Sequence, residues 1–381
     1  MIRTPSLGSP SGVRPSRSNQ DSLKLLLCSS ALLAFGIVMV ASSSIALAEP
    51  YFLKHLFFCF VGLLAAVVVF ILPSTVWSRY YLLAGFFAYL LAVLVFVPGF
   101  GHSANGATRW LNLGFLKLQV VELGKFFLMF FVAGYLQKYR EEIGKNSLHV
   151  FILMLVIAGY CLLIIQQPDL GSAAVIFVSC LAVLFVAGMR MKLFVVLAIG
   201  SILVVIWFIV MEPFRLERLL TFINPWKAPF DAGYQLVQAL IAFGRAGWLG
   251  LGLGEGVQKL YYLPEAHNDF IFAVIVEELG FVGAISLIAL YSCFIWLIFS
   301  IAKKALERGD FFGGYSCFFA GFLFAFQFSI NIGVNSGLLP TKGLTLPLIS
   351  YGGSSLIVSF MILGVLLRAS EAKDKIIEQK R

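Results

Sequence analysis

Three ionisable residues stand together in the stretch YYLPEAHNDFIF, where Glu265, His267 and Asp269 come directly before a long apolar run. Carboxylates and imidazoles are the side chains that most often move protons in enzymes. A chain this poor in charge has little reason to keep three such groups at one place unless they do something there. The stretch is therefore the first candidate for a site of chemistry.

A second charged pair lies inside an apolar segment, LQVVELGKFFLMFFVAGYL, which carries Glu122 and Lys125. Their i,i+3 spacing puts both on one helical face, where they can pair. Ionisable residues inside membrane segments are costly and usually face a cavity or path, but a pair snorkelling at the interface remains the alternative. Glu277 and Glu278 lie roughly 12 Å deeper than Asp269 along a helix. At most one of them is expected to face the interior squarely, and a structural hydrogen-bonding role stays as open as catalysis.

The elements that must position these groups are membrane helices. Hydrophobic residues make up 60% of the 381 residues and charged residues only 12%, with 38 phenylalanines. Apolar runs long enough to cross a bilayer repeat along nearly the whole chain. We predict an all-α integral membrane protein with about ten crossings, at 25–48, 55–72, 80–98, 118–138, 148–165, 172–189, 192–211, 270–301, 312–335 and 344–368.

Polar segments frame this membrane domain of residues 25–368. Residues 1–24 are rich in Ser, Pro, Gly and Arg and are predicted to be a disordered tail, and 369–381 form a second tail. The stretch SSIALAEP mimics a signal-peptidase site, but the apolar run before it is long for a signal peptide, so we expect it to be retained. The loop of residues 212–269 is the largest between crossings.

The basic residues predict the orientation of the chain. With the N-terminal tail inside, 18 of the 28 Lys and Arg residues lie on the inner side, nine lie outside and Lys125 lies within a helix. This excess predicts that both termini are cytoplasmic and that residues 212–269 are extracytoplasmic. The net charge of +9 then indicates attraction to anionic membrane lipid, and nucleic acid need not be invoked.

Several chemistries find no support in the sequence. The six cysteines all fall in predicted spans without metal-ligand spacing, and the four histidines are scattered, so neither indicates a metal cluster. There is no P-loop and no dinucleotide fingerprint, which makes direct use of ATP unexpected.

The unusual polar stretches all fall on the predicted outer side. They are NGATRWLNLG (105–114), QQPDLGS (166–172), GYQLVQALIAFGRAGWLGLGLGEGVQK (233–259), PEAHNDF (264–270) and LPTKGLTLPLISYGGSS (339–355). Within the third, apolar residues follow helical spacing from Tyr234 to Phe243 and leave Gln235 off the stripe, which predicts an amphipathic helix at the membrane surface. The glycines after it allow close backbone approach or a flexible hinge.

In their order and in their residues, these stretches resemble the SEDS family, the shape, elongation, division and sporulation proteins of bacteria. The resemblance runs from about residue 25 to 368, and LPTKGLTLP followed by SYGGSS resembles the cell-division branch more than the elongation branch. Three places depart from the family pattern. QVVELGK lacks the expected Pro-Ser before the Glu, HND replaces His-Thr-Asp, and GEGVQK has Glu255 in place of a Gly-x-Ser pattern.

The resemblance implies a peptidoglycan glycosyltransferase that polymerises lipid II on the outer face of the bacterial cytoplasmic membrane at the division site. Asp269 matches the family's essential acid, Glu122 and Lys125 match the charged pair of the fourth helix, and Arg109 with Trp110 match the preceding outer loop. Asp269 is then the expected general base. The residues predicted to bind substrate or stabilise the diphosphate are Arg109, Trp110, Glu122, Lys125, Gln235, His267, Lys342 and Ser354.

Cofactors and partners follow from the same resemblance. A divalent cation, Mg²⁺ or Mn²⁺, with unidentified ligands is an alternative or addition to basic residues for neutralising the leaving diphosphate. A cognate class B penicillin-binding transpeptidase and other division proteins are the expected protein partners. A lipid II flippase and a division scaffold that recruits a synthase remain open as alternative functions.

Overall fold

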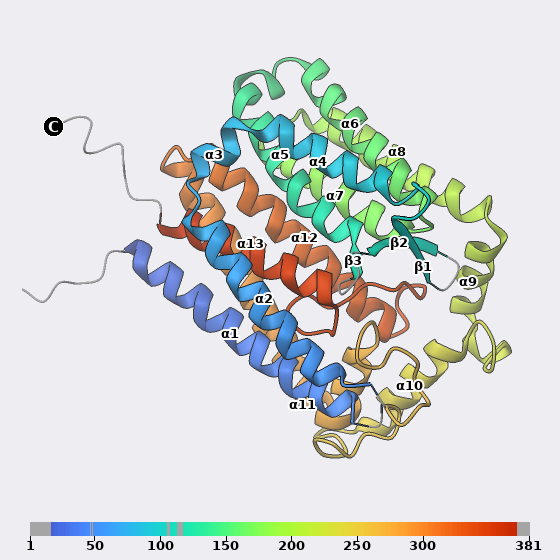
Figure 1. Cartoon of the computed structure of the whole chain (residues 1–381). Coiled ribbons are helices and arrows are strands. Elements are labelled where there is room, and N and C mark those ends of the chain that lie inside the picture. Colours follow the sequence, from blue (N-terminus) through green and yellow to red (C-terminus); the bar gives the residue numbers. More distant parts are fainter. Residues whose placement is uncertain (1–16, 46, 48, 105–106, 113–116, 372–381) are drawn as a thin grey trace, which may run out of the picture.

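The computed structural model describes residues 17–45, 47, 49–104, 107–112 and 117–371. This part of the chain is a bundle of long helices with one small sheet at its side (Figure 1). Eight of the described helices are long and apolar enough to cross a membrane, and two shorter apolar helices, Tyr81–Leu94 and Leu170–Val186, bring the number to ten. The predicted all-α membrane fold with about ten crossings is confirmed.

Each predicted span corresponds to one of these ten helices. They are α1 (Arg17–Ser43), α2 (Tyr51–Ile71), α4 (Tyr81–Leu94), α5 (Val120–Ile143), α6 (Ser147–Gln166), α7 (Leu170–Val186), α8 (Met191–Val210), α11 (Ile271–Glu307), α12 (Phe311–Asn335) and α13 (Gly353–Glu371). The other helices are α3 (Ser74–Arg79), α9 (Pro213–Ile223), η1 (Pro225–Lys227) and α10 (Tyr234–Ala246).

Two predicted boundaries differ from the structure. Helix α13 begins at Gly353 and not at 344, because Pro347 has no N–H for a helical hydrogen bond and the segment 340–352 is irregular. Helix α1 begins at Arg17, so residues 17–24 of the predicted tail are helical. The rest of that tail, and residues 372–381 of the C-terminal one, lie outside the described residues.

Helix ends meet on one side of the bundle, at the left of Figure 1. The Ser22 and Ser370 hydroxyls are 2.8 Å apart, and Lys304 Nζ lies 2.6 Å from Asp21 Oδ2. The start of α1 and the ends of α11 and α13 therefore lie on the same side of the membrane, as an even number of crossings requires.

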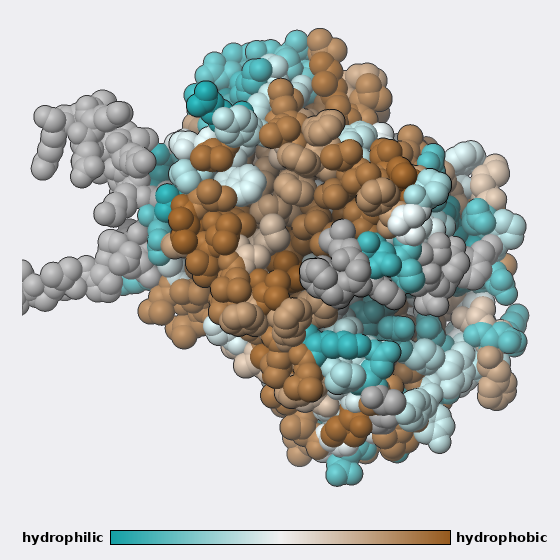
Figure 2. Space-filling model, viewed as in Figure 1, coloured by the Kyte–Doolittle hydropathy of each residue, from teal (hydrophilic) through white to brown (hydrophobic). Residues whose placement is uncertain are grey.

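The bundle has a packed centre and an apolar outside. Helix α5 is the most buried of the candidate spans, whereas no residue of α8 is buried. Figure 2 shows hydrophobic residues over the middle of the molecule and hydrophilic residues gathered at opposite ends. Close packing relies on glycine: a Cβ on Gly62 would lie 2.5 Å from the Phe360 ring and one on Gly364 2.5 Å from the Ala66 carbonyl. Small residues of this kind let membrane helices approach.

A three-stranded antiparallel sheet was not predicted from the sequence. It has the order β1 (Gly101–Ala104), β2 (Ala107–Asn112) and β3 (Lys117–Gln119), and Trp110 lies opposite both His102 and Gln119. Strand β3 runs directly into α5 and so fixes the start of the helix that carries Glu122. The pairing of β1 with β2 shifts register between His102 and Ser103, so Arg109 is an extra residue in β2 with no Cα partner in β1.

The large loop of residues 212–269 is structured. The predicted amphipathic helix is confirmed as α10, but its buried residues Leu236 and Val237 pack within the protein, against α11 and α12. The apolar stripe is therefore covered by the bundle. After α10, positive φ angles at Gly247, Gly250 and Gly252 turn the chain back along α11.

Helix α11 is broken at Gly280, where φ is 68° and ψ is −165°. The N–H groups of Leu251 and Gly252 donate to the carbonyls of Glu277 and Glu278, and the N–H groups of Phe281 and Val282 donate to the carbonyls of Gly247 and Trp248. The loop thus satisfies the backbone groups that the break leaves open. A Cβ on Gly250 would lie 2.2 Å from the Glu278 carbonyl oxygen, so no larger residue fits there.

The side chains of Glu277 and Glu278 are both fully buried, which corrects the expectation that only one would face the interior. Glu277 accepts from the N–H groups of Val257 and Gln258 at 3.2 and 3.1 Å. Glu278 accepts from Lys259 Nζ at 2.6 Å, with further bonds from Ser42 Oγ and Gly254 N. Both carboxylates are buried because the returning loop wraps around the helix, and their role is structural.

Candidate active site

Asp269 is presented by a tight turn just before α11. Glu265 has a φ of +57°, in the left-handed region that residues other than glycine rarely adopt. Its carbonyl accepts from the N–H groups of Asn268 and Phe270 at 3.0 and 3.2 Å. The turn places Asp269, which is partly buried, at the outer mouth of the helix bundle.

Two asparagines on α12 hold the backbone of Asp269. The Nδ2 atoms of Asn331 and Asn335 each donate to the Asp269 carbonyl at 3.0 Å, and Asn335 Oδ1 accepts from Ala273 N. Sequence reasoning missed both residues. Their i,i+4 spacing in an otherwise apolar helix was the available signal, since buried membrane amides usually have a partner to hold.

The loop before α13 closes against the same turn. Ser350 Oγ donates to the Asn268 carbonyl at 2.7 Å, and Tyr351 N donates to the His267 carbonyl at 3.0 Å. A Cβ on Gly343 would lie 2.7 Å from Asp269 Oδ2, so this glycine leaves the space that the carboxylate occupies. Lys342, its neighbour, is thereby brought into the site.

Arg109 and Asp169 form the other wall of the site. Arg109 donates through Nε to the Gln167 carbonyl at 2.8 Å and through Nη2 to the Pro168 carbonyl at 2.6 Å. Asp169 caps α7 by accepting from Ser172 N at 3.0 Å. The space beside Gly171 joins this wall to the loop before α13, because a Cβ there would lie 3.5 Å from Lys342 Cδ and 3.8 Å from Asp169 Oδ1.

The electrostatics of the site favour proton transfer near neutral pH. Burial, with the nearby charges of Glu265 and Asp169, raises the pKa of Asp269 to about 7, although Arg109 opposes the shift. Burial and the repulsion of neighbouring arginines lower the pKa of Lys342 to about 8, against the attraction of Asp169. An acidic group and a basic group whose pKa values are both shifted toward neutral pH are typical of a catalytic site.

Helix α9 contributes positive charge that sequence reasoning did not assign to the site. Arg215 and Arg218 lie close enough to Lys342 to lower its pKa, and burial with the charge of Arg109 lowers the pKa of Arg218. The signal was present in FRLER, where the two arginines stand one helical turn apart. The cationic wall therefore comprises Arg109, Arg215, Arg218 and Lys342.

His267 is buried beside the site and is held by aromatic rings. Its ring centroid lies 4.3 Å from that of Tyr51 and 5.5 Å from that of Tyr351. Burial lowers its pKa, so the imidazole is neutral at pH 7. Its ring forms no hydrogen bond with any described residue, so its observed contacts are with these aromatic rings.

The pairing predicted between Glu122 and Lys125 is confirmed. Lys125 Nζ lies 2.6 Å from Glu122 Oε1, and both side chains are buried in α5. The Tyr160 hydroxyl lies over Gly124, where a Cβ would come within 1.8 Å of it. No described contact joins this pair to Asp269, so it lies beneath the site as a neutralised unit.

Three further residues of the predicted site stand apart from Asp269. Ser354 Oγ accepts from Gln119 N at 2.9 Å and so ties α13 to the start of α5. Trp110 lies in the central strand of the sheet, paired with His102 and Gln119. Gln235 is partly buried in the first turn of α10. The structure thus brings Asp269, Arg109 and Lys342 together and gives Ser354 a structural contact.

The described residues do not supply a complete set of protein ligands for a divalent cation. Among the described residues, no group of three or more His, Cys, Asp or Glu side chains could hold a metal ion. Mg²⁺ is commonly bound through one or two carboxylates together with substrate phosphates. Asp269 and Asp169 fit that mode.

Fold and site together define a polytopic membrane protein with a carboxylate and a cationic wall at one end of its helix bundle. The family model of the FtsW, RodA and SpoVE proteins, described as "Cell cycle protein", matches residues 23–375. The chain belongs to this family. The resemblance to SEDS proteins is therefore confirmed.

Relatives in this family cover almost the whole chain. A protein of Coxiella burnetii named "Probable peptidoglycan glycosyltransferase FtsW" is 43% identical, over 90% of this chain and 94% of its own. A protein of the same name from Thioalkalivibrio sulfidiphilus is 44% identical, over 91% of this chain and 88% of its own.

Solved structures agree with this assignment. A chain of a peptidoglycan synthase complex that coordinates polymerization and crosslinking is 29% identical, with a TM-score of 0.76 over 91% of this chain and 96% of that chain. The rod shape determining protein RodA of Thermus thermophilus is 28% identical, with a TM-score of 0.66 over 91% of this chain and 95% of that chain.

Proposed function

We propose that this protein is a peptidoglycan glycosyltransferase that polymerises lipid II into β-1,4 glycan strands on the outer face of the bacterial cytoplasmic membrane during cell division. The observation that carries the proposal is the partly buried carboxylate of Asp269, with its raised pKa, facing a wall of four cations. Relatives more than 40% identical that are named as such enzymes support it.

Asp269 acts as the general base. The donor sugar is α-linked to a diphosphate and the product is β-linked, so one displacement with inversion accounts for the stereochemistry. The acceptor hydroxyl oxygen attacks the anomeric carbon as the bond to the diphosphate breaks, and Asp269 takes the hydroxyl proton. Its pKa of about 7 leaves much of it ionised at neutral pH and still basic enough to accept that proton.

The cationic wall stabilises the departing diphosphate. Arg109 is fixed by its two carbonyl acceptors, and Lys342 is held beside Asp169 and Gly171. Fixed positive charge in a partly dehydrated site stabilises developing negative charge more strongly than the same charge in water. No nucleotide is required, because the donor already carries its diphosphate.

A bound Mg²⁺ or Mn²⁺ would supply further charge neutralisation at the diphosphate. Asp269 and Asp169 would hold it jointly with substrate oxygens. The direct test is polymerisation after chelation with EDTA and after readdition of either metal. Activity unaffected by chelation would assign the whole task to Arg109, Lys342 and the α9 arginines.

A cognate class B penicillin-binding transpeptidase is the proposed partner, with other division proteins at the division site. The support is the structural likeness to a chain of a synthase complex that coordinates polymerization and crosslinking. A glycan strand without crosslinks bears no load, so the two activities belong together. Copurification in mild detergent tests the pairing, and full polymerase activity of the isolated chain without any bound transpeptidase would contradict an obligate partner.

Reconstitution with lipid II tests the proposed activity. The purified protein in liposomes should convert lipid II into glycan strands that resolve on a gel. Translocation of lipid II without strands would mean a flippase, and neither outcome, even with the transpeptidase present, would mean a scaffold. The Glu122–Lys125 pair, which a flippase path would require to be open, is closed on itself.

A further inference from the structure

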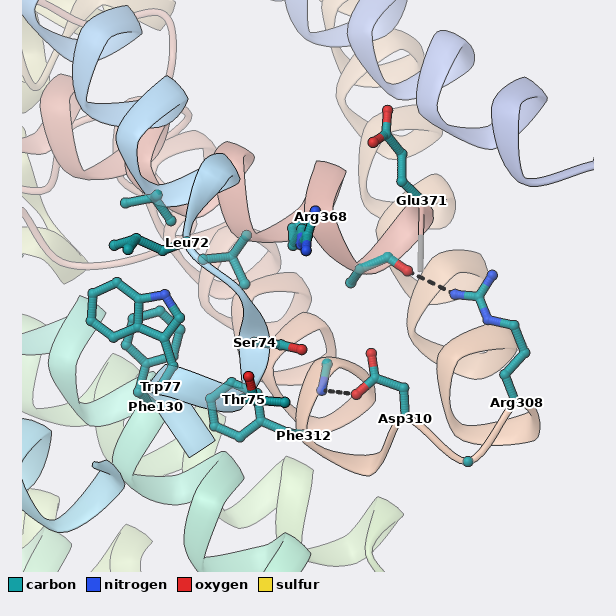
Figure 3. Close-up of a pocket in the computed structure, with 15 residues that line it drawn as sticks. Leu72, Ser74, Thr75, Trp77, Phe130, Arg308, Asp310, Phe312, Arg368 and Glu371 are labelled. Atoms are coloured by element: carbon teal, nitrogen blue, oxygen red, sulfur yellow. Dashed lines mark hydrogen bonds between the residues drawn. The ribbon is translucent and has the colours of Figure 1, made fainter. Parts of the chain in front are cut away.

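A second cavity, of about 490 Å³, lies at the end of the bundle opposite to Asp269. It opens between the α2–α3 joint, the start of α12 and the end of α13 (Figure 3). Leu72, Trp77, Phe130 and Phe312 form its apolar wall, and the Trp77 and Phe130 rings stack at 4.4 Å. The described ends of the chain lie on this side, which the basic residues predict to be cytoplasmic.

Hydrogen-bond donors around this cavity lack acceptors. Arg308 Nη2 donates a hydrogen bond to the Ala369 carbonyl at 2.7 Å. The buried Arg308 Nε and the buried Trp77 Nε1 have no acceptor in the described structure. Arg368 is exposed on the rim and makes no ion pair or hydrogen bond with any described residue. A buried donor left unpaired costs about 1–3 kcal/mol, so Arg308 Nε and Trp77 Nε1 indicate a missing acceptor, and Arg368 is free to meet the same ligand.

Acidic groups lie on the same rim. Asp310 uses Oδ1 to cap α12 through Gly313 N at 2.9 Å, and it forms no ion pair in the part of the chain described. Glu371 stands across the cavity from Asp310 at the end of α13 (Figure 3). Two arginines and two carboxylates leave the rim neutral overall. A simple anion would be repelled by the acids, whereas a ligand that carries both signs would satisfy both sets.

We propose that this cavity binds the headgroup of a membrane phospholipid that carries a phosphate and a primary ammonium group, as phosphatidylethanolamine does. The phosphate accepts from Arg308 and Arg368, and the ammonium donates to Asp310 and Glu371.

Apolar side chains are exposed on α2 beside the cavity. Val67, Val68 and Ile71 on the last turns of α2 are exposed and apolar, and they lead from the cavity toward the middle of the membrane. The acyl chains can lie along this face while the headgroup enters the rim. A soluble phosphate compound would gain nothing from these side chains, so they favour a lipid as the source of the phosphate.

Lipid retention by the whole purified protein tests the proposal. After delipidation in detergent, dioleoyl phosphatidylethanolamine, phosphatidylcholine and phosphatidylglycerol are added separately, and bound lipid is counted by native mass spectrometry. One phosphatidylethanolamine should be retained at least about tenfold better than either of the others. Binding to the folded state should also raise the melting temperature.

Matched variants locate the site. Arg368→Ala, at a residue without an ion pair or hydrogen bond to any described residue, should lower retention of phosphatidylethanolamine about tenfold. Asp310→Asn keeps the helix cap, because asparagine caps as well as aspartate, but removes the ammonium partner, so the preference over phosphatidylglycerol should disappear. Lys303→Ala removes a charge from an exposed position of α11 outside the cavity and should change neither.

Four results would overturn the proposal. They are equal retention of phosphatidylcholine, preference of the unmodified protein for phosphatidylglycerol, undiminished retention in Arg368→Ala, and stabilisation by free phosphoethanolamine equal to that by the lipid. The last result would assign the cavity to a soluble phosphate compound. None of these measurements depends on polymerase activity, so the lipid site and the proposed function can fail separately.

Discussion

The residues at the site are of two kinds: charged residues that we propose contact the substrate, and residues that hold the charged ones in position. Asp269, Arg109 and Lys342 carry charge toward one space, whereas Asn331 and Asn335 hold the Asp269 backbone. The acid was predictable because it belongs to a group of ionisable residues directly before a long apolar run. The asparagines were not, since an amide in a membrane helix has many possible partners and its spacing does not reveal which one it meets.

Asp269→Asn should lower polymerisation by about 10²–10⁴-fold, the usual contribution of a positioned general base. The amide keeps the size and hydrogen bonding of the side chain but cannot accept the proton. In the unmodified protein, kcat/KM should rise with pH through about 7 as the carboxyl ionises. Glu265→Gln is the control, because Glu265 shapes the turn through its backbone carbonyl, which the substitution keeps. Loss of its charge should only lower the Asp269 pKa, so activity should fall much less. Near-full activity of Asp269→Asn in lipid II assays would remove Asp269 from the role of base.

The same carboxyl makes a stability prediction. Its folded pKa is raised above the ordinary value of 3.8, so the folded state binds this proton more tightly than the unfolded state. The contribution to stability is therefore present at low pH and is lost as the pH rises toward 7. Asp269→Asn should melt at a higher temperature than the unmodified protein at pH 8, with a smaller difference at pH 5. The opposite trend would show that the carboxylate is stabilised by its cations.

Lys342→Arg should alter the alkaline side of the pH profile. A lysine with a pKa of about 8 loses its charge above that pH, and kcat/KM should fall about tenfold by pH 9. Arginine stays charged, so the variant should lose this decline even if its rate at pH 7.5 is lower. Lys227→Arg, at an exposed position of the same outer side, is the control. An unchanged alkaline limb would exclude Lys342 as its source.

At the scale of elements, the joints between helices are less visible in the sequence than the helices themselves. Periodicity and length predicted all ten membrane helices, because each apolar run must cross the bilayer. The break at Gly280 and the sheet of residues 101–119 were missed, since both depend on partners distant in the sequence. Glu277 and Glu278 were noticed as charges, but only the folded loop shows that both are hydrogen-bonded.

Lys259→Met should destabilise the loop that returns along α11. Lys259 and Glu278 are both buried and 2.6 Å apart, and removing one partner of a buried pair leaves the other uncompensated, at a cost of about 3–5 kcal/mol. The variant should melt at a lower temperature and be cleaved faster by protease between residues 247 and 262. Adding Glu278→Leu should recover part of the loss, and Glu255→Gln, at an exposed residue, should be neutral. A double variant no more stable than Lys259→Met would contradict the pairing argument.

At the scale of the whole molecule, the two ends of the bundle have different chemistry. The start of α11, the sheet and α9 lie at one end, and the described ends of the chain lie at the other with most of the basic loops (Figure 1). The sequence predicted this division through the distribution of Lys and Arg alone. It could not predict which outer segments meet, because that depends on how the helices pack.

A topology reporter tests which end faces the cytoplasm. A reporter active only outside the cytoplasm should be active when fused after Asn224, in the segment between α9 and α10, and silent after Gly309, in the α11–α12 turn. The expectation follows from the excess of basic residues on the side of Gly309. Activity in the reverse pattern would move Asp269 to the cytoplasmic side and contradict the proposed function.

The hydrogen bonds of Glu277 and Glu278 also bear on how this chain is made. Every group that satisfies these two carboxylates precedes them in the chain: Ser42 in α1, and the backbone and Lys259 between residues 254 and 259. A ribosome therefore delivers all their partners before it delivers α11 itself. Helix α11 can therefore enter the membrane when Lys259 and the other partners of its two buried acids have already been synthesised. Its insertion need not await the synthesis of α12 and α13.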